Sequence, residues 1–151
     1  MYKIKGKKIT DPTFKNKFKF VIDLSFFYFP LSILLINTET NELYIKDWVR
    51  ENSICQIFVL FKCNIDYFKK YINNELSFDQ LIKLNEYPIY VINENCNLEW
   101  ETIIEVDKND LPSSYISKGN FDKTDCPKFD KLEQFLNDYK ILKQEYPNPT
   151  Y

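Results

Sequence analysis

The fold is decided by one apolar stretch, residues 18–61, which reads FKFVIDLSFFYFPLSILLINTETNELYIKDWVRENSICQIFVLF. Its dense apolar runs are interrupted only by Tyr28-Phe29-Pro30, Thr38–Asn41 and Arg50–Ser53. Apolar runs separated by turn-forming residues are typical of strands, so this stretch predicts an antiparallel meander. Both faces are apolar in Ile33–Ile36, which is expected of a central strand that is covered on both sides.

The first strand of this meander is expected to alternate, from Phe14 onward, between an apolar face and a basic face. The apolar face comprises Phe18, Phe20, Ile22 and Leu24, and the basic face comprises Lys15, Lys17 and Lys19. Phe20–Ile36 is 17 residues long, but Asp23 and Pro30 within it favour two strands over a membrane-spanning helix. We therefore expect no membrane segment here.

Two helices are predicted after the meander, followed by a hairpin and a last helix. Asn64 resembles a helix N-cap, and Ser77 begins the sequence of a capping box. Pro88–Asn93 and Leu98–Val106 are predicted as paired strands around a polar turn. Pro127 suits the first turn of the last helix, which apolar residues at spacings of three and four then continue.

Together these elements predict a single α+β domain. Its sheet is expected to be mostly antiparallel with about six strands, formed by the meander plus the hairpin. Two short helices are inserted between the fourth and fifth strands, and a C-terminal helix follows. Within the domain 1–151 we distinguish a basic N-terminal arm (1–17), a core (18–123) and a C-terminal helix with its tail (124–151).

The residues that are missing exclude several chemistries. The chain has no His and only two glycines, Gly6 and Gly119. Without His it has no Ser-His or Cys-His nucleophile pair and no imidazole base, and without clustered Gly it has no phosphate-binding loop. We therefore predict a protein that is not an enzyme, with no catalytic, cofactor-binding or metal-binding residues.

Cysteine usage indicates a reducing, cytoplasmic setting. The four cysteines, which form no C-x-x-C motif, are Cys55, Cys63, Cys96 and Cys126. A disulfide scaffold is normally shorter and denser in Cys, so free buried thiols are expected rather than disulfides or a four-thiolate metal site. A polar stretch follows the basic residues Lys3–Lys8, where a secretory signal would have an apolar core.

The total formal charge is only −2, but positive and negative charges are distributed unevenly along the chain. Residues 1–20 contain seven lysines against the single acid Asp11, which gives +6, while the rest has 13 basic and 21 acidic residues, which gives −8. Lys15, Lys17 and Lys19 are candidates for binding nucleic-acid phosphates, with nearby aromatic side chains stacking on bases. The alternative is a solvated face that protects an edge strand, which the absence of Arg from this arm favours.

The predicted strand Leu98–Val106 carries carboxylates at alternating positions. Glu99, Glu101 and Glu105 are expected on one of its faces. Such a row is a candidate surface for a basic protein partner, and carboxylates are also ligands for Mg²⁺ or Ca²⁺. Because hard-cation sites usually draw their ligands from several elements, a solvated strand face is favoured over a metal site.

The last helix is a second candidate interaction surface. Its apolar stripe includes Tyr139 and ends near Tyr146, before Pro147 and Pro149. The stripe either docks on the sheet of the same chain or forms a seam with a partner or with a second copy in a homodimer. The sequence leaves both arrangements open.

Several segments resemble a small bacterial family whose domain is catalogued only as a domain of unknown function. In order, the segments are Phe29-Pro30-Leu31, Glu42–Trp48, Ile65–Ile72, Leu76–Ile82 and Asp110–Ile116. The likeness covers about residues 18–123 and leaves out the basic arm and the last helix. Members often have Gly where this chain has Asn73-Asn74-Glu75. The resemblance implies a fold and a bacterial cytosolic setting, and it implies no catalytic residues.

These observations lead to two functional hypotheses. The first is a non-enzymatic bacterial interaction protein, such as an immunity, antitoxin-like or inhibitor component, that presents an acidic, aromatic-rich surface to a protein partner. Its candidate contact residues are Glu99, Glu101, Glu105, Tyr139 and Tyr146. The second is a nucleic-acid-binding accessory protein that uses Lys15, Lys17 and Lys19.

Overall fold

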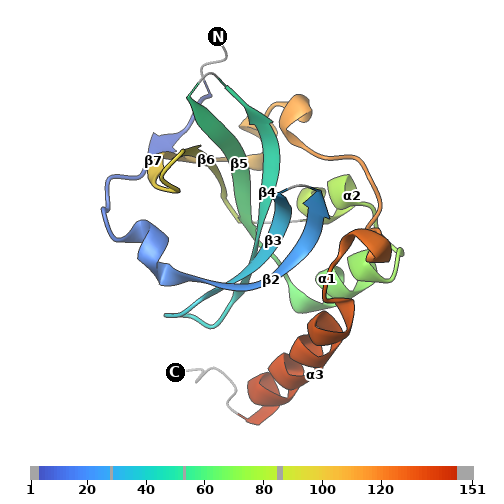
Figure 1. Ribbon diagram of the computed structural model, residues 1–151. Coiled ribbons are helices and arrows are strands. Elements are labelled where there is room, and N and C mark those ends of the chain that lie inside the picture. The colour runs from blue at the N-terminus through green and yellow to red at the C-terminus, as the bar shows by residue number, and fades with distance from the viewer. Residues whose placement is uncertain (1–3, 28, 53, 85–86, 146–151) are drawn as a thin grey trace.

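A computed structural model describes residues 4–27, 29–52, 54–84 and 87–145. They form an α+β fold on one antiparallel sheet of seven strands, in the order β1-β7-β6-β5-β4-β3-β2 (Figure 1). The strands are β1 (Lys7–Lys8), β2 (Phe18–Phe27), β3 (Phe29–Asn37), β4 (Leu43–Glu51), β5 (Cys55–Lys62), β6 (Ile89–Asn95) and β7 (Trp100–Val106). The helices are α1 (Ile65–Ile72), α2 (Phe78–Lys83) and α3 (Phe129–Glu145). The predicted fold class is confirmed, and the basic arm contributes the additional strand β1.

The predicted meander is confirmed, because β2, β3, β4 and β5 pair in chain order as antiparallel neighbours. β5 is buried on both faces. Val59 and Phe61 point into a core that the helices cover, whereas Phe58 and Leu60 point to the opposite face. We call these the helix-covered face and the concave face. The concave face has its own smaller apolar cluster, which includes Phe14.

Local sequence signals determine where the two inserted helices begin. The Asn64 side chain accepts hydrogen bonds from the backbone N–H groups of Asp66 and Tyr67, which caps α1. Ser77 and Gln80 form the predicted capping box of α2, since each side chain bonds the backbone of the other residue. Both helices then bury an apolar stripe on the sheet, and their N-terminal polar groups are satisfied.

α3 docks on the helix-covered face of its own chain. Leu132, Leu136 and Tyr139 are buried in the core cluster on this face. The Tyr139 hydroxyl donates a hydrogen bond of 2.8 Å to the backbone carbonyl of Asn41 in the β3–β4 turn. The apolar stripe of α3, which the sequence assigned either to the same chain or to a partner, is therefore used within the chain as far as Tyr139.

β1 and β2 lie at opposite edges of the sheet although they follow one another in the chain. Nine residues, 9–17, connect them, and the last four form a 3-10 turn, η1 (Phe14–Lys17). If η1 rises about 2.0 Å per residue and the other residues are fully extended, this connection reaches roughly 28 Å. A flat sheet of seven strands would be roughly 29 Å wide, which is no shorter than that reach. A further turn at Pro12-Thr13 shortens it. The sheet must therefore curl, and Figure 1 shows the connection bridging its two edges.

The prediction that the first strand begins at Phe14 with a common apolar face is wrong in two respects. Lys15 and Lys17 lie in η1 rather than in a strand. A β-bulge then interrupts the β2–β3 pairing between Phe20 and Ile22. Because the extra residue reverses the alternation, Phe18 and Phe20 face the concave side, whereas Ile22 and Leu24 belong to the helix-covered core.

The four cysteines are free, but they are not all buried. Cys55, Cys63 and Cys126 are buried, whereas Cys96 is exposed in the β6–β7 turn, so the expectation of a buried thiol is wrong there. In the part of the chain that the structure describes, no helix combines the length and apolarity needed to cross a membrane.

Asp47 is a buried carboxyl group on the helix-covered side of β4. It is 7% exposed, and one of its oxygens accepts a hydrogen bond of 2.8 Å from the Ser117 hydroxyl. Burial raises its pKa to about 7, although hydrogen bonds from Ser117 and Ser32 act in the opposite direction. The unfolded chain would release this proton near a pKa of 3.8. The contribution of Asp47 to stability therefore falls as the pH rises from about 4 to 7.

Asp47→Asn is expected to stabilise the protein at pH 8 by roughly 2 kcal/mol, because it removes a buried charge while keeping an acceptor for Ser117. The advantage over the natural protein should shrink as the pH is lowered and vanish near pH 4. Urea unfolding of both proteins at several pH values measures it. A difference that does not change with pH would contradict the titration of Asp47 in this range.

Gly6 leaves no room for a side chain beside β7. A Cβ atom there would lie 2.4 Å from the backbone oxygen of Glu105 and 2.6 Å from Cγ2 of Ile104. Gly6→Ala should cost roughly 1–3 kcal/mol or detach β1, and it should increase hydrogen exchange at the Ile9 amide, which donates to Ile103. Gly119→Ala is the matched control, because no atom lies within 4 Å of its Cβ position and stability should change little.

Candidate functional site

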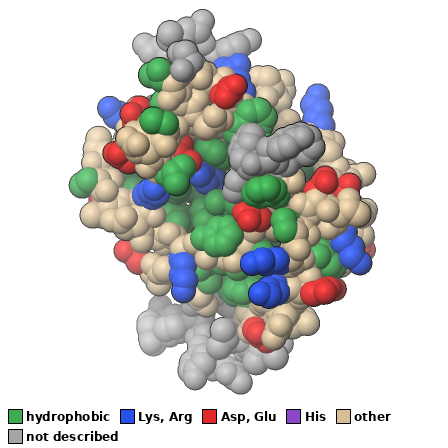
Figure 2. Space-filling view, viewed as in Figure 1, with side chains coloured by type: hydrophobic (Ala, Val, Ile, Leu, Met, Phe, Trp, Pro, Cys, Tyr) green, Lys and Arg blue, Asp and Glu red, His purple; other side chains and the backbone are tan. Residues whose placement is uncertain are grey.

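A half-open pocket of about 650 Å³ lies on the concave face. Figure 2 shows hydrophobic side chains gathered around a hollow on this face, with charged side chains near it. The apolar lining consists of Phe18, Phe20, Ile33, Leu35, Phe58, Leu98 and Trp100, and the polar lining consists of Lys15, Asp23, Lys46, Gln56 and Glu94. Pockets of this size, with an apolar lining and a few polar groups, are typical of binding sites.

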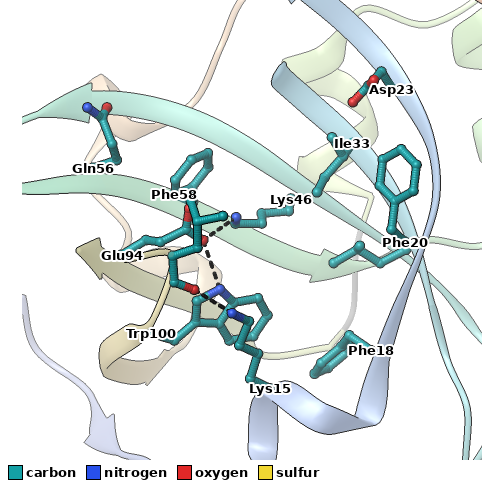
Figure 3. Close-up of a pocket in the computed structure, with 12 residues that line it drawn as sticks. Lys15, Phe18, Phe20, Asp23, Ile33, Lys46, Gln56, Phe58, Glu94 and Trp100 are labelled. Carbon is teal, nitrogen blue, oxygen red and sulfur yellow. Dashed lines mark hydrogen bonds and ion pairs between the residues drawn. The ribbon is translucent and has the colours of Figure 1, made fainter. Parts of the chain in front are cut away.

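Cross-strand pairing separates the charged groups of the pocket. Asp23 on β2 pairs with Ile33 on β3, and Ile33 pairs in turn with Lys46 on β4. Because neighbouring strands are spaced about 4.8 Å apart, the backbones at Asp23 and Lys46 lie roughly 10 Å apart. Figure 3 shows Asp23 near Ile33 at one end of the pocket and the group formed by Lys46, Glu94 and Trp100 away from it.

Lys46 and Glu94 form a buried ion pair. Nζ of Lys46 lies 2.5 Å from Oε2 of Glu94, and each residue is only 7% exposed. The indole N–H of Trp100 donates to the same oxygen at 2.9 Å, and Nζ lies 3.9 Å from the ring centre of Phe58. Burial lowers the pKa of Lys46, while the hydrogen bond and charge of Glu94 oppose that shift. These contacts hold both side chains in place, and their opposite charges compensate each other within the pocket.

Aromatic contacts fix η1 as one wall of the pocket. The ring centre of Phe14 lies 5.3 Å from that of Phe18 and 6.3 Å from that of Trp100. Nζ of Lys15 donates a hydrogen bond to the backbone carbonyl of Leu98 and lies 5.9 Å from the Trp100 ring centre. These contacts tie η1 to the β6–β7 turn, and they leave the opposite side of the pocket open.

Leu98, at the rim of the pocket, has a costly conformation. Its side chain is 64% exposed, and its φ of 63° lies in the left-handed region. For a residue with a large side chain this backbone conformation costs on the order of 1 kcal/mol. Asn or Gly would adopt it more readily, and an exposed apolar side chain gains little from folding. The stability of the fold therefore does not explain why Leu occupies this position.

A second hollow, of about 490 Å³, adjoins the pocket and shares Lys15 and Trp100 with it. Its lining includes the carboxylates of Asp11, Glu99 and Glu101. The same lining includes Lys8 and Lys15, so three carboxylates face two lysines, and we call this second site the acidic hollow.

The structure does not bring the three glutamates of the predicted acidic row onto one face. Glu101 is the extra residue of a bulge on β7, because Asn93 pairs with Thr102 but the next residue, Glu94, pairs with Trp100. Glu99 lies before β7, and Glu105 pairs with Lys7 on β1. Glu99 and Glu101 line the acidic hollow, whereas Glu105 lies nearer the other end of β7.

The lysines of the predicted basic face are also separated. Lys15 lines the pocket and bonds Leu98, and Lys17 forms an ion pair of 3.3 Å with Asp11. Lys19 pairs across the sheet with Ile36, a residue that packs against the helix-covered core. The predicted row of three lysines on one strand face is therefore wrong, because Lys15 and Lys17 lie in η1 and only Lys19 lies in β2.

Of the two tyrosines named as contact residues, Tyr139 is 5% exposed and bonded to Asn41. Tyr146 lies outside the described residues. Asp23, Lys46, Glu94 and Leu98 were not identified as site residues from the sequence. A lone lysine at position 46 within an apolar strand was a usable signal, because a buried charge needs a counter-ion. Its partner is 48 positions away, and nothing local to the sequence indicates that pairing.

No protein-family model, curated protein or solved structure matches this chain. The resemblance to a bacterial family over residues 18–123 stays a prediction. Within the described ranges, no group of three or more Cys, Asp or Glu side chains is arranged to hold a metal ion. The function is therefore inferred from the pocket and its surroundings.

Lys46→Met is expected to lower the free energy of unfolding by roughly 3 kcal/mol, because it leaves the charge of Glu94 buried without its counter-ion. Adding Glu94→Gln should recover most of that loss, because the double variant buries no charge there. Urea unfolding of the single and double variants measures the coupling. A single-variant loss below about 1 kcal/mol would mean that the pair behaves like an exposed ion pair.

Proposed function

We propose that this chain is a non-enzymatic protein-interaction module, of the immunity, antitoxin-like or inhibitor kind, whose protein partner docks on the concave face. The observation that carries the proposal is the half-open aromatic pocket, in which the charges of Lys46 and Glu94 compensate each other. An ammonium group bonded to a carboxylate has no free lone pair for nucleophilic attack, so the pocket is better suited to binding than to covalent catalysis.

The open apolar rim supports a protein partner rather than an enclosed small ligand. Phe20 is 54% exposed and Leu98 is 64% exposed, and both line the pocket. Small-molecule sites usually bury most of the ligand surface, whereas interfaces surround a central pocket with apolar anchors that become buried only in the complex. Leu98 fits the second pattern, because its conformational cost would be offset by contact with the partner.

The charge next to the pocket supports a basic partner. Glu99 and Glu101 line the adjoining hollow, and the chain beyond residue 20 has a formal charge of −8. Acidic groups beside an apolar anchor steer a basic partner toward it and exclude acidic competitors. The nucleic-acid alternative gains no support from a continuous basic surface, since Lys15, Lys17 and Lys19 are dispersed.

Leu98→Asn is expected to weaken binding of the partner without lowering the stability of the fold. The variant should be as stable as the natural protein or up to about 1 kcal/mol more stable, because Asn tolerates the left-handed conformation better. It should nevertheless bind the partner at least about tenfold more weakly, because it removes an apolar anchor. Urea unfolding measures the first effect, and affinity capture from a lysate of the source organism followed by titration of the captured protein measures the second.

Leu84→Asn is the matched control, because Leu84 is also exposed but follows α2, away from the concave face. A protein that is retained by the natural chain and by Leu84→Asn, but lost by Leu98→Asn, supports the proposal. Equal retention by both variants would overturn it. So would tight, salt-sensitive binding of DNA or RNA that Leu98→Asn leaves unchanged, since phosphate contacts would then carry the affinity.

A further inference from the structure

One polar atom of the pocket has no partner. Among the side-chain nitrogens and oxygens that the structure describes, Oδ1 of Asp23 is buried and accepts no hydrogen bond. The other carboxylate of the pocket, Glu94, is bonded to both Lys46 and Trp100. A buried acceptor without a donor is costly in a folded protein, and a cation bound at the same carboxylate group would offset part of that cost.

We infer that the pocket receives a Lys or Arg side chain of the protein partner, with its cationic head on Asp23 and its aliphatic stem along Phe20 and Ile33. This inference rests on the proposed function and names the group that the partner inserts. Asp23 pairs with Ile33 across β2 and β3, and Figure 3 shows Phe20 and Ile33 on the same side of the pocket as Asp23.

The chemistry of the pocket matches such a side chain at both ends. Lys and Arg lay their aliphatic stems on apolar surfaces while the charged head stays with polar groups. The exposed ring at this end, Phe20, adds a favourable interaction with a cation. An anionic head would be repelled by the carboxylate of Asp23, and a purely apolar side chain would leave that carboxylate without a counter-ion. A cation on an apolar stem therefore satisfies Asp23 best.

Cationic groups of the same chain lie around Asp23 but do not bond it. The charged or titratable groups that surround its carboxylate or backbone are Lys128, Lys131 and Cys126 beside β2, and Lys15, Lys46 and Glu94 across the pocket. Burial raises the pKa of Asp23, and the charge of Lys128 opposes that shift. Because a bound cation favours the ionised carboxylate, binding should weaken as the pH is lowered through the pKa of Asp23.

Two short peptides test the inference directly. Acetylated and amidated Leu-Lys-Leu is compared with the same peptide carrying norleucine in place of Lys, which keeps an aliphatic stem without the charge. The proteins are the natural chain, Asp23→Asn and Lys128→Met, and binding is followed by NMR at the amides of residues 20, 23 and 33. We expect the Lys peptide to bind the natural chain roughly 10- to 100-fold more tightly than the norleucine peptide.

Asp23→Asn should abolish this preference, so that the variant binds the two peptides with similar affinity. Lys128→Met should keep or increase the preference, because it removes a competing cation. Equal binding of the two peptides by the natural chain, a preference that survives Asp23→Asn, or no shift of these amides with either peptide would each overturn the inference. None of these results bears on Leu98-dependent capture of the partner, so a failure of this inference can be told apart from a failure of the proposed function.

Discussion

The short connection between β1 and β2 is the constraint on which the concave face depends. These strands occupy opposite edges of a seven-stranded sheet, yet only residues 9–17 join them. The chain therefore curls the sheet until its edges approach one another. Phe14 anchors the connection among the aromatic side chains of the concave face, and Lys15 ties it to the β6–β7 turn. Without this link the same residues would line an open surface instead of a pocket.

The two faces of the sheet differ in how much apolar surface they bury. On the helix-covered face, α1, α2 and α3 bury one continuous core. The hydroxyl of Tyr139 on α3 donates a hydrogen bond to the β3–β4 turn. The concave face buries a smaller cluster and leaves Phe20 and Leu98 exposed. β5 contributes buried side chains to both faces, so the strand at the centre of the core also forms part of the floor of the pocket.

The features that the sequence predicted correctly are those that depend on residues close together in the chain. The caps at Asn64 and Ser77 and the meander from residue 18 to 61 follow from local patterns and are confirmed. Bulges between residues 20 and 22 and at Glu101 carry no clear sequence signal, so the predicted apolar face of the first strand and the predicted glutamate row failed. The lysine row failed because Lys15 and Lys17 lie in η1. The pocket was beyond prediction for a related reason, because it depends on contacts such as Lys46–Glu94 between distant segments.

Three features of the concave face oppose stability, and all three border the same pocket. Leu98 holds a left-handed backbone, Asp23 buries an oxygen without a donor, and Phe20 exposes an aromatic ring. On the other face the buried carboxyl group of Asp47 is also costly when ionised, but it is hydrogen-bonded to Ser117 and Ser32. Local rules are broken mainly where a site has work other than folding to do. In the proposed complex, the inserted basic side chain would cover the Phe20 ring and place a cation on Asp23, and a separate apolar contact of the same partner would cover Leu98, so one partner would offset all three costs.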